Sequence, residues 1–311
     1  MIVGTVVQGF WGDYPGLSAR LTHLTQLLDR LAGESQKRYG RRLDLAVLPE
    51  TAVTSGAGRD GEAGALPYQG EVQRTFSRKA QELGCYIVVP LYLLEGRKVS
   101  NAAVLIDRKG EVAGIYRKVH VAVHTGADSM EAGTTPGTEV PVFACDFGKL
   151  GIQICFDMEY DYGWRELARK GADLVAWPTA SPQTAHPAFR AMRHRYYIVS
   201  SPWRHNASIF EPTGKITAQV NLREQTLVRE LDLSYAILPW SERLENGNAL
   251  RKKYGRKVGF RYYEEEDSGI FWSNDPRLTI GKMIRSLGLA EAESELERIR
   301  LLYRKAGVPS Y

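Results

Sequence analysis

The sequence has few cysteines, no long apolar run and no block of charge of one sign. Its three cysteines, Cys85, Cys145 and Cys155, are odd in number and widely separated, which argues against a disulfide framework. No two of them have the Cys-x-x-Cys spacing of a zinc site, and we expect no metal. Charged residues interrupt every apolar run before it reaches the ~20 residues that cross a bilayer, so we expect no membrane partner.

The N-terminal residues and the charge pattern exclude two further classes. The first residues lack the basic start and the small-residue cleavage site of a secretory signal, so we expect a cytoplasmic protein. The net charge of +5 is scattered along the chain, and its densest clusters, at residues 251–253 and 256–257, precede an acidic run at residues 264–267. This pattern is typical of a solvated surface, and we expect no nucleic-acid partner.

What the sequence does contain is typical of a globular protein. Its 311 residues are 43% hydrophobic and 25% charged, which is enough to bury a core. Strand-like runs and helical periodicities alternate over residues 1–240, which predicts a mixed α/β (α+β) domain. Residues 241–311 show a weaker pattern. We interpret them as a C-terminal extension that packs on the domain or on a partner, ending in a helix from about Glu291 to Lys305.

Several predicted elements bear on function. Leucines at helical spacing from Leu17 to Leu31 predict a helix that ends near Gly33. A second helix is predicted from about Glu71 to Leu83, with Gly84 at its C-cap. Residues 43–48 and 150–155 are predicted strands. The Gly- and Ala-rich segment 51–70 has no clear period and is predicted to be a long loop, which in a compact domain is often functional.

One cysteine stands at a chemically useful place. Cys155 ends an apolar strand (LGIQIC) and precedes a turn towards a helix, where nearby backbone N–H groups favour the thiolate. Taken alone, the same pattern fits a buried strand cysteine, which is how we interpret Cys85 and Cys145.

Two charged residues stand at comparable places. Glu50 comes directly after the strand at residues 43–48, where a carboxylate beside a core needs a partner or a raised pKa. Lys118 follows a predicted strand at residues 111–117. Taken separately, Glu50 fits a surface glutamate equally well, and Lys118 fits an exposed turn lysine better than a functional residue.

Taken together, these sites resemble the nitrilase superfamily, the carbon–nitrogen hydrolases. The three motifs stand in the family's order, as LPE at residues 48–50, YRKVH at 116–120 and GIQICFD at 151–157. Two further segments are similar to family motifs, GADLV at 171–175 and SIFEPTG at 208–214. The resemblance covers about residues 1–235, so we expect a carbon–nitrogen hydrolase domain at residues 1–240.

The resemblance implies a four-layer α-β-β-α sandwich, a homodimer or higher homo-oligomer, and a catalytic trio. Cys155 would be the nucleophile and Glu50 the general base, while Lys118 and the Phe156 N–H would stabilise the oxyanion. Glu131, in the segment MEAGTTPG, corresponds to the family's second glutamate, although this segment is about one residue shorter than usual. This chemistry needs no cofactor.

The branch of the family is indicated by the residues after the cysteine. Nitrilases proper usually have Trp-Glu there, whereas this chain has Phe156-Asp157, as amidases and carbamoylases more often do. We therefore expect a small linear amide or an N-carbamoyl compound as substrate, in a pocket that includes Phe156, Trp177 and Thr179.

Three other functions stay open at this point. The chain could act on a nitrile, or it could be a catalytically silent binding protein on the same scaffold. A Cys–His enzyme would use His120, His124 or His186 in place of Glu50.

Overall fold

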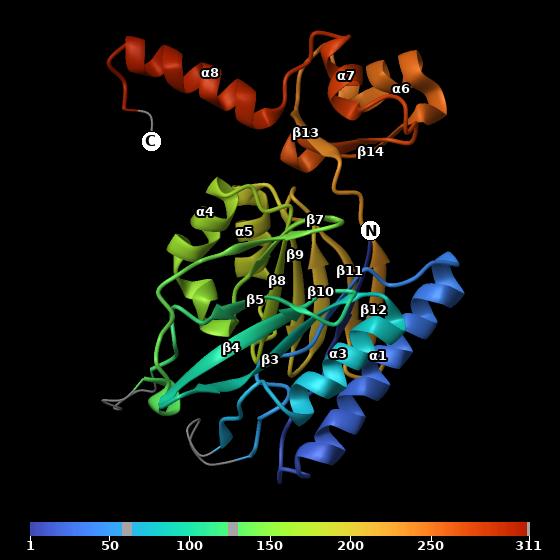
Figure 1. The fold of residues 1–311 in the computed structure, drawn as a ribbon. Coiled ribbons are helices and arrows are strands. Elements are labelled where there is room, and N and C mark those ends of the chain that lie inside the picture. The colour runs from blue at the N-terminus through green and yellow to red at the C-terminus, as the bar shows by residue number, and fades with distance from the viewer. Residues whose placement is uncertain (58–63, 124–129, 310–311) are drawn as a thin grey trace. The chain divides into compact units, whose positions relative to one another are not determined.

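The computed structural model describes residues 1–57, 64–123 and 130–309. The chain forms two compact units, Met1–Leu231 and Asp232–Tyr311 (Figure 1). The sequence pattern alone places this boundary later, after residue 240. The structure places it before β13 (Tyr235–Pro239), because this strand pairs with a strand of the second unit.

The first unit is built on two six-stranded sheets with the same plan. In each, three parallel strands lie at the centre and antiparallel strands lie outside them. The first sheet has the order β12 (Thr226–Glu230), β1 (Ile2–Val6), β2 (Leu45–Val47), β3 (Tyr86–Glu95), β4 (Lys98–Ile106), β5 (Val112–Arg117). The second has the order β11 (Ile216–Asn221), β10 (Asn206–Phe210), β9 (Tyr197–Pro202), β8 (Leu174–Thr179), β7 (Gly148–Ile152), β6 (Val142–Cys145).

The two sheets pack face to face, and helices cover their outer faces. Buried hydroxyls join the sheets, since Thr5 Oγ1 donates to the Ser200 carbonyl at 2.7 Å and Ser201 Oγ donates to the Val6 carbonyl at 2.9 Å. Helices α1 (Leu17–Tyr39) and α3 (Glu71–Leu83) lie on one side, and α4 (Asp161–Arg169) and α5 (Ala185–His194) on the other (Figure 1). The predicted α-β-β-α sandwich is confirmed.

Local signals predicted α3 well but α1 too short. Helix α3 has the predicted bounds, and Gly84 at its C-cap is left-handed, with φ 61°. Helix α1 was expected to end near Gly33 but continues to Tyr39, where Gly40 provides the left-handed cap. The leucine face of α1 packs in the core of the first sheet, and Ser35, beyond Gly33, is buried as well. Tertiary packing therefore outweighs the cost of about 1 kcal/mol for a glycine inside a helix.

The second unit has a core of its own. Strands β13, β15 (Ser268–Ser273) and β14 (Val258–Tyr263) form an antiparallel sheet in that order. Helices α6 (Asn248–Tyr254) and α7 (Ile280–Arg285) accompany this sheet. The shared core consists mainly of Leu238, Leu244, Leu250, Phe271, Met283 and Ile284. The predicted terminal helix is α8 (Ala292–Lys305), of which only Ala292 is buried.

Five short 3-10 helices complete the described elements. They are η1 (Glu131–Gly133), η2 (Cys155–Glu159), η3 (Glu245–Gly247), η4 (Gly255–Lys257) and η5 (Glu264–Glu266). Across the three described ranges, no helix combines the length and apolar character that a membrane crossing requires.

Candidate active site

Strand ends position the three residues that the motifs single out. Glu50 lies in the turn after β2, Cys155 in the turn after β7, and Lys118 directly after β5. The parallel strands at the centre of each sheet direct the first two turns to one edge of the sandwich. Contacts between β2 and β8 join the two sheets near this edge. Residues far apart in the chain therefore meet there.

The turns that carry Glu50 and Cys155 are built alike. Both contain a non-glycine residue in the left-handed region, Cys155 itself with φ 40° and Thr51, next to Glu50, with φ 48°. Such a backbone is strained and is retained where the surroundings impose it. Here an indole N–H supports each turn, because Trp203 Nε1 donates to the Glu50 carbonyl at 2.8 Å and Trp177 Nε1 donates to the Cys155 carbonyl at 3.2 Å.

The predicted strand at residues 150–155 was too long. Strand β7 ends at Ile152, and Cys155 begins η2. The strand stops there because the Asp157 side chain, and not a neighbouring strand, accepts the Ile154 N–H. Its buried carboxylate accepts hydrogen bonds from the Ile154 N–H at 2.9 Å and from the Tyr116 hydroxyl at 2.7 Å.

Lys118 is buried between two carboxylates. Its side chain is 1% exposed, and Nζ lies 2.9 Å from Glu50 Oε1 and 2.7 Å from Glu131 Oε2. Burial opposes the charge of Lys118, but the carboxylates of Glu50 and Glu131 hold its pKa well above the ordinary value. Lys118 therefore stays an ammonium.

Glu131 occupies the place that the motif comparison predicted. It begins η1 and is 8% exposed. Besides the Lys118 ammonium, its Oε2 accepts a hydrogen bond from the Ala122 N–H at 3.0 Å. The shortened MEAGTTPG segment still brings this carboxylate to Lys118. The structure thus brings Glu50, Lys118, Glu131 and Cys155 into one cluster.

The Cys155 thiol is protonated at rest. Burial raises the pKa of Cys155 to about 12, and the Glu50 carboxylate raises it as well. Lys118, the Ala180 N–H and the Thr179 side chain lower this pKa, but they do not outweigh burial. The surroundings of Cys155 therefore favour the thiol and not the thiolate that the sequence pattern suggested, and the proton needs an acceptor when the thiol reacts.

The predicted pocket residues have different surroundings. Thr179, at the end of β8, hydrogen bonds to Cys155 and accepts the Ser181 N–H at 2.8 Å. Phe156 is half-buried and packs edge-to-face against Tyr160. Trp177 is fully buried in the core of the second sheet, so it supports the Cys155 turn and does not line a surface open to substrate.

Two residues at the site were missed by sequence reasoning. Asn101, on β4, donates through its side-chain amide to both Glu50 and Glu131. Tyr92 is its cross-strand partner on β3, and burial together with the charges of Glu131 and Glu50 raises the pKa of its hydroxyl. Neither belongs to a motif quoted above. A polar side chain within a largely apolar strand was the only available signal.

Asp157 was noted only as a mark of the family branch, yet it joins two parts of the site. Besides its bonds within η2, its Oδ1 accepts the His120 N–H at 2.8 Å and lies 3.2 Å from His120 Nδ1. The His120 ring also stacks on Tyr160, with 4.1 Å between ring centres. Asp157 therefore connects the Cys155 turn to the segment that carries Lys118.

The histidines do not form a dyad with Cys155 in the described part of the chain. His120 is held by Asp157, and His186 is exposed near Glu159. His124 lies outside the described residues. The carboxylate that acts on the Cys155 thiol is Glu50, so the described residues favour the Glu50 assignment over the Cys–His alternative.

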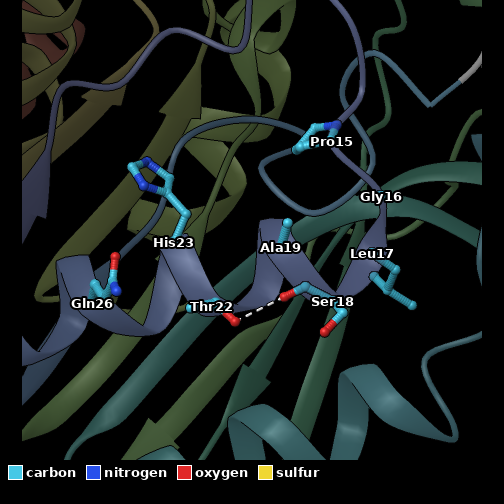
Figure 2. A pocket seen from close by; sticks show the side chains of 8 residues that line it. All are labelled: Pro15, Gly16, Leu17, Ser18, Ala19, Thr22, His23 and Gln26. Carbon is cyan, nitrogen blue, oxygen red and sulfur yellow. Dashed lines mark hydrogen bonds between the residues drawn. The ribbon is translucent and has the colours of Figure 1, made fainter.

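Other candidate sites on the described residues are weak. No group of three or more His, Cys, Asp or Glu side chains within these ranges is arranged to hold a metal ion. A surface hollow lies at the start of α1 (Figure 2), where it is lined by Pro15, Gly16, Leu17, Ser18, Ala19, Thr22, His23 and Gln26. This lining holds no nucleophile paired with a base, so the Cys155 cluster is the better candidate for an active site.

Comparisons with known proteins agree with the motifs. The carbon–nitrogen hydrolase family matches residues 6–238. The deaminated glutathione amidase of Homo sapiens is 25% identical over 198 residues, covering 54% of this chain and 60% of that protein. The omega-amidase NIT2-A of Xenopus laevis is 28% identical over 189 residues, covering 53% of this chain and 68% of that protein. The chain thus spans less than two thirds of the human relative's length.

The fold has close counterparts among solved structures. Saccharomyces cerevisiae Nit3, a member of branch 10 of the nitrilase superfamily, matches with a TM-score of 0.62 at 20% identity. The match covers 82% of this chain and 94% of that chain. Since the family match spans most of the first unit and its sandwich has the family's fold, the chain belongs to the carbon–nitrogen hydrolase family, the nitrilase superfamily that its motifs resemble.

Proposed function

We propose that this protein is a cysteine-dependent hydrolase that cleaves a non-peptide C–N bond of a small linear amide or N-carbamoyl compound. One observation carries the proposal: a buried ammonium, Lys118, is held between two carboxylates beside a protonated thiol. Burying three charged groups is costly, and a protein that only binds a ligand gains nothing from it. Acyl transfer to a thiol uses all three charged groups, Lys118, Glu50 and Glu131.

The first half of the reaction forms a thioester. Glu50 accepts the Cys155 proton as Sγ attacks the substrate carbonyl carbon. Lys118 and the Phe156 N–H stabilise the charge that develops on the carbonyl oxygen. The C–N bond then breaks, and Glu50 returns its proton to the leaving nitrogen, so that ammonia or an amine departs. Glu131 holds the Lys118 ammonium in place throughout.

The second half releases the acid. Glu50 takes a proton from a water molecule, whose oxygen attacks the thioester carbonyl carbon. The C–S bond breaks, the acid leaves, and the proton returns to Cys155. Amide substrates fit this sequence better than nitriles, because a nitrile develops its charge on nitrogen. The amidase names of the two sequence relatives support the same choice.

A substrate screen tests the proposal. Ammonia release should be measured across small amides, ureido acids and nitriles, with Cys155→Ala as the inactive control. Mass spectrometry of the quenched enzyme should detect an adduct equal to the acyl group on Cys155. Turnover of nitriles without any amide or ureido activity would change the branch. Activity that survives in Cys155→Ala would refute the mechanism.

We also propose that the protein works in the cytoplasm as a homodimer or higher homo-oligomer. Large apolar side chains are exposed on two helices, Phe189 and Met192 on α5 and Leu301 and Leu302 on α8. Contact with a second copy would remove this apolar surface from water. The C-terminal unit, with α8, would then pack on the partner subunit.

A further inference from the structure

Asn101 contacts every charged member of the cluster. It lies on β4 and is 1% exposed. Its Nδ2 donates to Glu50 Oε1 at 2.9 Å and to Glu131 Oε1 at 2.5 Å, while its main-chain carbonyl accepts the Lys118 N–H at 2.8 Å. No other described residue is recorded with hydrogen bonds to all three.

The orientation of this amide is determined by its partners. Both Glu50 and Glu131 present carboxylate oxygens, which accept hydrogen bonds, so the NH₂ end of Asn101 must face them. The other end, Oδ1, is buried without a hydrogen-bond partner within the described ranges. An unpartnered buried acceptor costs free energy, and its presence indicates that the amide is retained for what its nitrogen does.

The cluster has more negative than positive charge. One ammonium, that of Lys118, forms ion pairs with two carboxylates, those of Glu50 and Glu131. The neighbouring side chains of Cys155 and Tyr92 add no positive charge. Two carboxylates that share a site tend to bind a proton, which leaves one of them neutral. Each carboxylate also accepts a hydrogen bond from a backbone N–H of its own, Glu50 from Ala180 and Glu131 from Ala122. Besides Lys118, Asn101 donates to both carboxylates, and it does so without adding a charge.

We propose that Asn101 is a positioning residue that keeps Glu50 and Glu131 ionised together around Lys118, so that Glu50 is ready to accept the Cys155 proton. This proposal rests on the proposed function and adds a residue to it. Each of its two N–H groups offsets part of the repulsion between the carboxylates. Asn101 does not touch the reacting atoms, so its effect should fall on Glu50 and not on substrate binding.

The test replaces Asn101 and follows the pH dependence of the reaction. In Asn101→Leu, the acid limb of the kcat/KM profile should move up by about one pH unit, which is about tenfold in rate below the limb. Asn101→Asp, which adds a third carboxylate, should move it further. KM should stay within about twofold, because substrate contacts are unchanged. A role in folding alone would lower activity equally at every pH.

A matched control lies one residue away. Ser100 is also buried on β4 but projects to the opposite face of the strand, so Ser100→Ala should keep the parent profile. Thermal unfolding of every variant checks the fold, and Asn101→Ser replaces Asn101→Leu if the leucine is not accommodated. An unmoved acid limb in the folded Asn101 variants would overturn the proposal.

A second readout separates this proposal from the proposed function. The rate of Cys155 alkylation by iodoacetamide, followed against pH by mass spectrometry, reports on Glu50 without any substrate. Asn101→Leu should move its acid limb upward as well, and in a Glu131→Gln background, which lacks the second carboxylate, this shift should disappear. A shift that persists there would also overturn the proposal. An unmodified enzyme that alkylates normally but hydrolyses nothing would refute only the proposed function.

Discussion

At the scale of single residues, the nucleophile and its base depend on each other. Burial keeps the Cys155 thiol protonated, with a pKa of about 12, so its reactivity at neutral pH requires a neighbouring proton acceptor. Glu50 is the acceptor that the proposed mechanism uses. Its charge also raises the pKa of the thiol, so the same carboxylate stabilises the resting thiol and removes its proton during attack.

The first prediction concerns Cys155. Cys155→Ala should abolish turnover and leave the unfolding temperature within a few degrees of the parent. Iodoacetamide should label Cys155 faster than Cys85 or Cys145 in the native protein, because Ala180 and Thr179 also hydrogen bond to Cys155 and lower its pKa. The carboxylates near Cys85 and Cys145 are Asp44 and Asp146, and both pair with Arg108. Peptide mapping measures the three rates. Equal labelling of all three thiols would contradict the assignment.

The second prediction concerns Glu50. Glu50→Gln keeps the shape of the side chain but removes the proton acceptor, so kcat/KM should fall by roughly 10²–10⁴-fold. Steady-state kinetics on the best substrate of the screen measures it. Asp44→Asn, a change of a carboxylate that pairs with Arg108 away from the cluster, is the control and should keep activity. If Glu50→Gln stays active while a histidine variant is dead, the Cys–His mechanism holds.

The third prediction concerns pH and the cysteines. Burial raises the pKa of Cys85 from 9.0 to about 12, so above pH 9 the unfolded chain loses the thiol proton while the folded chain keeps it. The stabilisation is complete below pH 9 and is lost as the pH rises towards 12. Urea unfolding of the parent should therefore show falling stability over this window. Cys85→Ala should show a shallower fall, and an unchanged slope would contradict the shifted pKa.

At the scale of elements, the two sheets carry equivalent turns. Each turn follows a central parallel strand, contains a left-handed non-glycine residue, and accepts an indole N–H at a main-chain carbonyl. Asp157 then joins η2 to the end of β5 through Tyr116 and His120. The position of Cys155 relative to Lys118 thus depends on one buried carboxylate.

The fourth prediction tests that connection. Asp157→Ala leaves the Ile154 and His120 N–H groups without an acceptor, so we expect a loss of about 2–4 kcal/mol of unfolding free energy and at least a tenfold fall in kcat. The control is Asp173→Ala, since Asp173 also accepts a backbone N–H, that of Lys149, at an exposed position. It should keep kcat. An Asp157→Ala enzyme with the parent kcat would show that the link is not needed.

At the scale of the whole molecule, helix α8 has large apolar side chains that the second unit leaves exposed. In α8, the side chains of Leu301, Leu302 and Tyr303 are about half exposed, although the helix has acidic residues in its first turn and basic residues in its last turn. These charges stabilise the helix itself. Its large apolar side chains are not buried in the core of the second unit.

The fifth prediction follows from this surface. The native protein should be at least a dimer at micromolar concentration, and Leu301→Glu together with Leu302→Glu should weaken association. Light scattering measures the mass. Leu222→Glu, at an equally exposed leucine of the first unit, is the control for added charge. A monomeric parent protein would contradict the proposed assembly.

The sequence by itself determined the family, the order of the motifs and the elements whose signals are local. Helix α3 has the predicted bounds because its apolar spacing and its C-terminal glycine lie within a few residues of each other. Glu50, Lys118 and Cys155 were predicted as a trio because their motifs stand in the order of the family that the sequence resembles.

The tertiary structure decided what depends on residues far apart in the chain. It extended α1 beyond Gly33, ended β7 before Cys155, and buried Trp177 in the core. It also brought Asn101 against Glu50, 51 positions away. No local pattern contains such a contact, because charge balance, burial and the pKa of a thiol are set by neighbours from other strands.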